Sequence, residues 1–211
     1  GWVLYIDADQ DGALDLAGHV EPDESDDGEF LNRISPDVTL QAVGAGVATN
    51  QVTARISGLA STGFEVFSSD WPQDLLWREG QAELHGEFLV PVAAVSLDFV
   101  ADDADDVGRL EVYDLRGNRI AVSSVQPGAG QSQGMVIAFN DARIASFRAF
   151  AGGSAGRLDH LAFGGEGQEP FDITDLGGRY VIRDLALANY DGREVLRPGW
   201  TQTAPAAGAH G

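Results

Sequence analysis

Hydrophobic and polar residues alternate along most of the chain, with the two-residue period that is typical of half-buried β-strands. Together with β-branched residues between Gly, Asn and Pro, the alternation predicts strands at 2–7, 38–43, 52–57, 64–69, 109–114, 119–124, 135–140, 146–151, 158–163, 179–185 and around 193–196. Residues 82–101 predict two strands around Pro91, and Gly117-Asn118 predicts the turn of a hairpin within 109–124. Short strands with this spacing favour β-sandwiches.

Two turn-rich segments, 21–36 and 164–170, divide the pattern. The chain before the first and after the second is too short on each side to fold as a domain by itself. We therefore predict a discontinuous domain of residues 1–20 and 168–211, interrupted by an inserted module of residues 21–167. The chain begins at Gly1 without Met or a signal peptide, so we expect it to be a piece of a longer polypeptide whose other domains are its neighbours.

Composition excludes several classes of function. The 211 residues include no cysteine and no lysine, which excludes disulfides, thiol catalysis and lysine isopeptide crosslinks. With 33 acidic residues against 13 arginines, the net charge of −20 disfavours nucleic acid and anionic membranes as partners. No apolar run approaches the ~18 residues that membrane insertion needs. Divalent cations or basic partners suit this charge; the alternative is that it only keeps a secreted or halophilic protein soluble.

The segment DADQDGALD, residues 7–15, has the spacing of a Ca²⁺-binding loop. Asp7, Asp9, Asp11 and Asp15 occupy loop positions 1, 3, 5 and 9, Gly12 stands at the bend, and Ala13 would offer its carbonyl oxygen. Two carboxylates ~4 Å apart repel by about 4 kcal/mol at an effective dielectric constant of 20, so four of them need a cation between them. Oxygen ligands favour a hard cation, which predicts Ca²⁺. The alternative is a solvated acidic turn after a strand.

The loop is not a complete EF-hand. Position 12 is Gly18, where a bidentate Glu belongs, and a strand precedes the loop where an EF-hand has a helix. Glu21 is the candidate for the missing ligand, with Asp23 as its alternative. We therefore expect the loop to bind Ca²⁺ with the modest affinity that is typical of extracellular modules.

The two ends of the chain resemble one family. GWVLYIDADQDGALD, then DITD with GRY and IRDL (172–185), and finally YDGREVLRPGWTQTAPA (190–206), are similar to the serine-aspartate repeat protein B-like domain. This resemblance implies a prealbumin-like (Ig-like) β-sandwich of the collagen-adhesin B type, repeated in stalks of bacterial surface proteins. The Gly-Glu that usually follows the family's calcium loop is displaced here to His19-Val20-Glu21.

The inserted module resembles galactose-binding and carbohydrate-binding jelly-roll β-sandwiches of secreted bacterial proteins, on the stretches EPDESDDGEFLNRISPDVTLQAVG, STGFEVFS, VAAVSLDFVADDADDVGRLEVYDLRGN and GRLDHLAFG. The resemblance implies a second, structural Ca²⁺ between the acidic segment after residue 20 and the final strand. Glu21, Asp23 and Asp159 are the matching candidates. The alternative is that Asp159 only hydrogen-bonds a turn.

Trp71 and Trp77 are the candidates for stacking on a glycan, and their alternative role is to cover the open end of the sandwich. No nucleophile elbow, phosphate loop or zinc spacing is present, so we predict no enzymatic activity. Together these features predict an all-β, extracellular or cell-surface structural and adhesive module that calcium makes rigid. Its expected partners are neighbouring domains of the same polypeptide, with glycans or host matrix proteins as further candidates. The alternative function is a carbohydrate-binding module that targets a larger secreted protein or enzyme to glycans.

Overall fold

The computed structural model describes residues 2–7, 14, 16–69, 75–152, 155–166, 169–174, 177–182, 185 and 189–195. Within these ranges the chain forms fourteen β-strands and one short 3-10 helix, and no helix is long and apolar enough to cross a lipid bilayer. In chain order the elements are β1 (Val3–Asp7), β2 (Leu16–Val20), η1 (Pro22–Glu24), β3 (Val38–Val43), β4 (Val52–Ile56), β5 (Glu65–Ser69), β6 (Glu83–Val92), β7 (Ala94–Ala101), β8 (Val107–Tyr113), β9 (Arg119–Val125), β10 (Ser132–Ala138), β11 (Ile144–Gly152), β12 (Gly156–Glu166), β13 (Phe171–Ile173) and β14 (Asp191–Glu194). The predicted all-β fold is confirmed.

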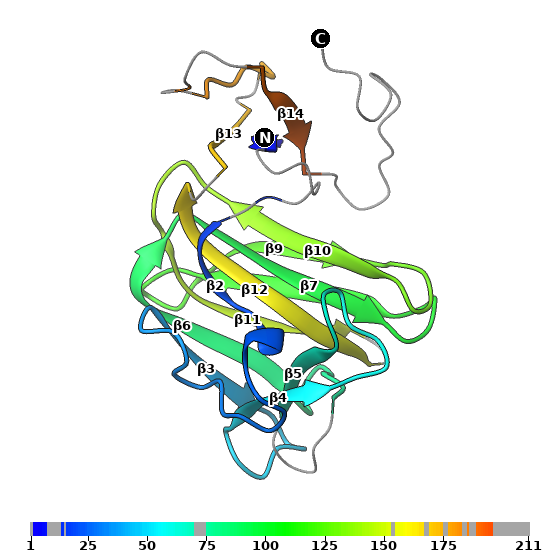
Figure 1. Ribbon diagram of the computed structural model, residues 1–211. Helices are drawn as coiled ribbons and strands as arrows, with labels where there is room; N and C mark the ends of the chain where they lie inside the picture. The colour runs from blue at the N-terminus through cyan, green and yellow to red at the C-terminus, as the bar shows by residue number, and fades with distance from the viewer. Residues whose placement is uncertain are drawn as a thin grey trace.

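Two of the three antiparallel sheets face each other as a β-sandwich (Figure 1). One has the strand order β10-β7-β12-β5-β4, with β2 also pairing with β12, and the other has the order β3-β6-β11-β8-β9. Alternate residues of each strand turn inward. The core between the sheets is built from buried aliphatic and aromatic side chains, the largest being Trp77, Phe67, Phe99, Phe147, Leu40, Leu84, Leu97, Leu110 and Met135.

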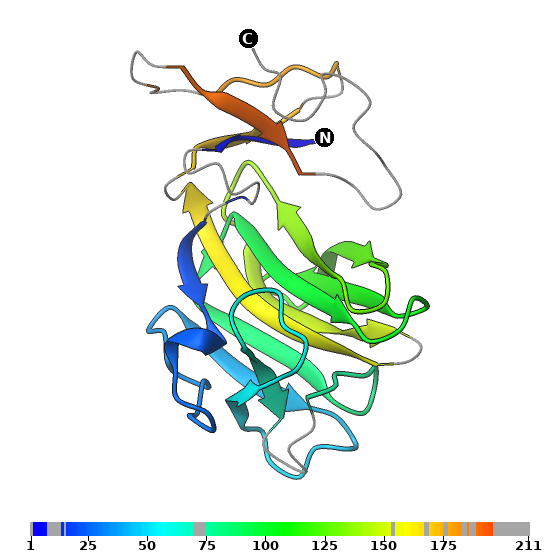
Figure 2. The same ribbon diagram turned by 45° about the vertical axis from the view of Figure 1, so that its right-hand side comes forward.

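The third sheet, which we call the connector sheet, has the order β13-β1-β14 and lies beyond one end of the sandwich (Figures 1 and 2). Its first strand comes from one end of the described chain and its other two strands from the opposite end. A small second core joins it to the sandwich, where Tyr5 and Phe171 of the connector sheet pack with Leu16, Ala94 and Ala162.

Strand β2 belongs to the sandwich rather than to the connector sheet. It pairs with β12 through Leu161↔Val20, Ala162↔His19 and Phe163↔Gly18. Residues 16–20 were predicted to belong to the discontinuous domain of residues 1–20 and 168–211, because the calcium-loop pattern links them to β1. The register places them on the other side of the junction, while the division of the chain into two domains stays a prediction.

Several strand predictions differ from the structure. The break between β6 and β7 falls at Ala93, and Pro91 lies inside β6. The β6–β11 ladder is irregular between Ser146↔Glu87 and Ile144↔Val92, so the missing N–H of Pro91 interrupts no regular pairing. The described residues 179–182 form no strand; there the Val181 backbone N–H donates to the carboxylate of Asp172, 2.6 Å away. Strands β2 and β13 were not predicted.

Candidate functional site

Of the four aspartates in the predicted calcium loop, the structure describes Asp7. It ends β1 and is buried, and its Oδ2 lies against Nε of Arg193 on β14. Its Oδ1 receives no hydrogen bond from the described residues. Asp9, Asp11, Ala13 and Asp15 lie outside the described residues.

The second predicted calcium site gathers at the outer face of the β7-β12 sheet, under the loop 57–64. Glu21 and Asp23, at the start of η1, and Asp159, on β12, reach this loop from two segments far apart in sequence. Asp159 Oδ2 accepts hydrogen bonds from the Ser61 N–H at 2.8 Å, the Ser61 hydroxyl at 2.9 Å and the Thr62 N–H at 3.3 Å. Asp159 thus hydrogen-bonds a turn, which is the alternative that the sequence left open.

Asp23 holds the other side of the same loop. Its Oδ1 accepts the backbone N–H groups of Phe64 at 2.7 Å and Glu65 at 3.0 Å. Gly63 has a positive φ of 43°, and a Cβ there would lie 2.2 Å from the Asp23 carboxylate, so only glycine fits. Glu21 completes the set by accepting the Thr62 hydroxyl at 3.1 Å.

His160 is the residue of this cluster that the sequence analysis missed. It is the extra residue of a bulge in β12, where the register shifts between Asp159 and Leu161, and it has a positive φ of 42°. The bulge turns its ring toward Glu21, with 2.6 Å between Nδ1 and Glu21 Oε2. No sequence spacing marks this contact, since it depends on the bulge.

Burial and charge shift the pKa values of four neighbouring groups: Asp159, Asp98, His160 and Glu21. Burial raises the pKa of Asp159 to about 6 and also raises the pKa of Asp98, which pairs directly opposite it on β7. The hydrogen bond to Glu21 raises the pKa of His160, although burial alone would lower it. Burial alone would raise the pKa of Glu21, but the hydrogen bond and charge of His160 hold it below its ordinary value.

The arrangement of these side chains is one in which hydrogen bonds hold the loop 57–64 against the sheet. Among the described residues no three His, Asp or Glu side chains are arranged to hold a metal ion. At least one oxygen of each of Glu21, Asp23 and Asp159 accepts a hydrogen bond from the loop 57–64, and Glu21 also contacts His160. These contacts tie the loop to the sheet, and the second Ca²⁺ that the jelly-roll resemblance implies stays a prediction.

The predicted glycan platform is not formed by Trp77. Its side chain is fully buried in the sandwich core, and its Nε1–H donates to the Phe67 carbonyl oxygen at 2.9 Å. A buried ring cannot stack on a sugar, so the prediction of Trp77 as a ligand-binding residue is wrong. Trp71 lies outside the described residues.

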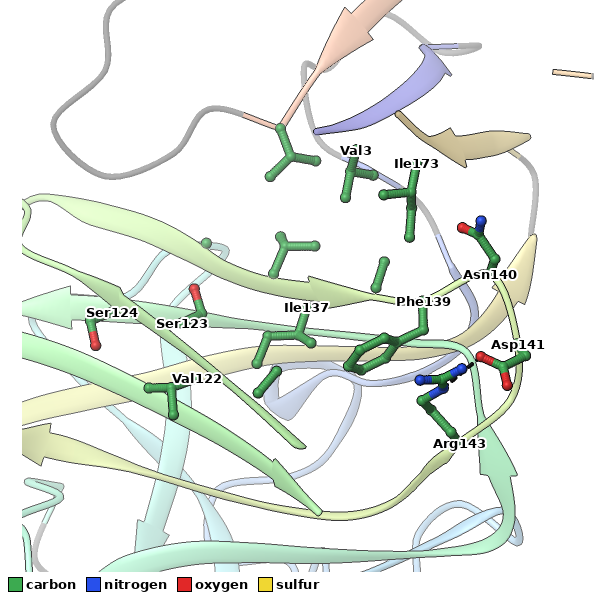
Figure 3. Close-up of a pocket in the computed structure, with 15 residues that line it drawn as sticks. Val3, Val122, Ser123, Ser124, Ile137, Phe139, Asn140, Asp141, Arg143 and Ile173 are labelled. Atoms are coloured by element: carbon green, nitrogen blue, oxygen red, sulfur yellow. Dashed lines mark hydrogen bonds and ion pairs between the residues drawn. The ribbon is translucent and has the colours of Figure 1, made fainter. Parts of the chain in front are cut away.

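A cleft of about 640 Å³ opens between the connector sheet and the sandwich. Figure 3 shows Val3 and Ile173 of the connector sheet on one side, with Ile137 and Phe139 of the sandwich on the other. The ion pair of Arg143 with Asp141 lies at one end. The junction is therefore packed on the side of Tyr5 and Phe171 and open on this side.

Comparison with known proteins identifies no relatives by sequence: no protein-family model matches the chain, and no curated protein matches it. Among solved structures, the chain is similar to the enzymatically active domain of tailspike protein 4 from bacteriophage CBA120, with a TM-score of 0.34 and 17% sequence identity. The match covers 66% of this chain and 21% of the tailspike chain.

Proposed function

We propose that the chain is a non-enzymatic structural and adhesive module of a bacterial surface or secreted protein. The observation that supports this most directly is the pairing of β1 with β14, the first and last strands described. Leu4 pairs with Glu194 and Asp7 with Asp191, and the Val195 N–H donates to the Val3 carbonyl oxygen at 3.0 Å. The chain thus enters and leaves through one small sheet (Figure 2).

In this geometry the connector sheet joins the module to the rest of the polypeptide, and the sandwich is the part that is displayed. Tension along the polypeptide reaches β1 and β14 first, and the sandwich lies outside that load path. Because the strands are antiparallel and loaded at the same end, their hydrogen bonds break one after another from Val3–Val195 toward Asp7–Asp191. A sandwich held aside from the load keeps its surface intact for contacts with other molecules.

Calcium would stiffen the junction in this proposal. Asp7 ends the connector strand β1, and β2 of the sandwich begins at Leu16, so a cation held by residues 7–15 ties the two sheets together. The buried Oδ1 of Asp7, which has no donor among the described residues, fits a cation ligand. The cleft beside Val3 leaves the junction open on one side, where an additional tie would limit rocking.

The calcium part is tested by thermal melting with added Ca²⁺ and with a chelator. Saturation at about 100 times Kd should add about 2.7 kcal/mol of stability. Asp11→Asn should abolish this gain, whereas Asp105→Asn, at an exposed position of another loop, should preserve it. Equal melting temperatures with and without Ca²⁺ would remove the metal from the proposal.

The connector part is tested by pulling the chain from both ends in a single-molecule experiment. The connector sheet should open first and release about 15 nm of chain, which is the extended length of residues 3–15 and 167–195. The sandwich should unfold in a separate, later event. A single event that releases the whole chain would contradict a connector outside the sandwich.

The carbohydrate-binding alternative can no longer use Trp77. It would need another polar or aromatic surface on the sandwich.

A further inference from the structure

The outer face of the five-stranded sheet presents a row of polar side chains that crosses four of its strands, β3, β6, β11 and β8. Register places them directly opposite one another, as Gln41↔His85, His85↔Arg148 and Arg148↔Glu111, and the next position, on β9, is the apolar Val122. Neighbouring strands lie about 4.8 Å apart, so the polar row is roughly 14 Å long. This is the face away from the core, because Leu110 and Val112, which flank Glu111, are buried between the sheets.

Glu111 lies at one end of this row and is covered by the side chains that bind it. Its two oxygens accept from Arg148 Nε at 2.7 Å, Arg119 NH1 at 2.8 Å, Arg109 Nε at 2.9 Å and the Tyr113 hydroxyl at 2.6 Å. Arg148 also reaches Glu83 at 3.3 Å, and Glu83 contacts His85 at 3.1 Å. The sequence carried the signal for part of this cluster, because R-L-E-V-Y places Arg109, Glu111 and Tyr113 on one face.

The cluster gathers three of the 13 arginines of an acidic chain on one face. Burial alone would raise the pKa of Glu111, but the hydrogen bonds from Tyr113, Arg148 and Arg109 lower it to about 2, so it stays ionised. Three guanidinium groups stand against the carboxylates of Glu111, Glu83 and the exposed Glu87, so this face is locally neutral, where the whole chain carries −20.

The guanidinium groups also keep donors to spare. Each carries five N–H donors, and Arg109 and Arg119 each give one to Glu111. Their side chains are 37% and 50% exposed. Because Glu111 fixes their position beforehand, little side-chain freedom would be lost when they bind a carboxylate in the bidentate manner that arginine favours.

We propose that this face binds an acidic polysaccharide, with carboxylate groups of the polymer on Arg109 and Arg119 and its hydroxyl groups along the polar row. This inference rests on the proposed adhesive function and names its partner. A polysaccharide fits better than an acidic peptide, because the face presents both donors and acceptors, such as Gln41 and Tyr113, over the full row. An extended peptide would instead pair its backbone with the edge of a sheet.

The probe is polygalacturonate, with the fully methyl-esterified polymer as a matched neutral control. Binding is measured by calorimetry in about 0.15 M salt, where the Debye length of about 8 Å screens the distant acidic surface. The wild-type protein should bind the acidic polymer at least about tenfold more tightly than the ester, which corresponds to about 1.4 kcal/mol.

Matched variants locate the site. Arg119→Gln should weaken binding about tenfold, while Arg143→Gln, at a similarly exposed arginine that pairs with Asp141 beside the cleft, should leave it within about twofold. Glu87→Gln should strengthen binding, because Glu87 is an exposed acid on the same face, opposite Ser146. Should Arg119→Gln melt abnormally early, Arg109→Gln is the second variant for the same measurement.

Three outcomes would overturn the proposal: no binding of polygalacturonate, equal binding by Arg119→Gln and wild type, or equally tight binding of poly-L-glutamate. The last result would show that charge alone is recognised. These measurements use the isolated chain without Ca²⁺, so failure here leaves the connector geometry untouched. Failure of the melting or pulling tests would likewise leave a measured glycan affinity in place.

Discussion

His160 Nδ1 lies 2.6 Å from Glu21 Oε2, which brings together two residues 139 positions apart in the chain. The contact joins the bulge of β12 to the residue that caps η1, and Thr62 donates to the same Glu21 oxygen. Strand, short helix and the loop 57–64 therefore share one ionisable cluster. The protonation state of that cluster should control how firmly the loop is held.

We expect the protein to be more stable near pH 5 than near pH 7.5. The pKa of Asp159 rises from about 3.8 unfolded to about 6 folded, so the folded state binds an extra proton between these values and loses stability as pH rises through them. The full effect from below pH 3.8 to above pH 6 is roughly 3 kcal/mol, of which about 1.4 kcal/mol falls between pH 5 and pH 7.5. The raised pKa of His160 acts in the same direction, with stability present below 6.5 and lost as pH rises through the folded pKa.

Thermal melting across this pH range measures the effect. Asp159→Asn should remove most of the Asp159 contribution while keeping an oxygen acceptor for Ser61. A stability that is flat or that rises from pH 5 to pH 7.5 would contradict the assigned shifts. Below pH 4.5 the lowered pKa of Glu21 has the opposite sign, because its stabilisation is lost as pH falls.

Glu111→Gln should cost about 3 kcal/mol of stability at neutral pH, since it leaves three guanidinium groups around an uncharged amide. The wild-type protein should also lose stability as pH falls from 4.5 toward 2, the folded pKa of Glu111. Urea unfolding of both proteins across this range checks the prediction. If the variant and the wild type lose stability equally on acidification, Glu111 is not the group that titrates.

Gly18→Ala should destabilise the fold by about 1–3 kcal/mol through overpacking. A Cβ at Gly18 would lie 2.6 Å from Cε2 of Phe163, the residue it pairs with on β12. Gly18→Glu, which restores the EF-hand residue at position 12, should therefore lower stability and give no gain in Ca²⁺ affinity. Gly58→Ala is the control, because no atom lies within 4 Å of its Cβ. Tighter Ca²⁺ binding by Gly18→Glu would contradict this packing role.

Trp77→Ala should cost about 3–5 kcal/mol, as expected for a large aromatic residue removed from a core. Trp77→Phe should cost less, since it keeps a benzene ring in the core and removes only part of the buried volume together with the hydrogen bond to the Phe67 carbonyl oxygen. Chemical denaturation measures both. Neither change should alter glycan affinity in the folded protein, and a selective loss of affinity in Trp77→Phe would restore Trp77 as a ligand-binding residue.

The sequence correctly predicted the strands in which apolar and polar residues alternate, because such strands bury one face against the core. Residues 38–43 are the clearest example, because Val38, Leu40 and Ala42 are buried and the residues between them are more exposed. Strand β2 was missed since its Gly18 and His19 break the pattern, and its pairing with β12 is a long-range contact. Around Pro91 the local rule was overridden by an irregular ladder.

The sequence predicted which carboxylates meet at the candidate site better than it predicted what those carboxylates bind. Glu21, Asp23 and Asp159 do meet at one loop, but their oxygens hold Ser61, Thr62 and the backbone at Phe64. Which atoms an oxygen contacts depends on the turn and on the bulge at His160, and neither leaves a spacing signal. Trp77 was misassigned because an aromatic residue between strands reads the same whether it faces outward or inward.

The hydrogen bond between Val3 and Val195 has a consequence for how a module of this kind can be transferred from one gene to another. Where the incoming and outgoing strands are neighbours, a recombination event can splice the whole body into an exposed turn of an unrelated host, and the host backbone on either side keeps its original spacing. Excision restores the turn just as simply. For the surface module proposed above, this would allow selection to exchange the displayed surface without redesigning the protein that carries it.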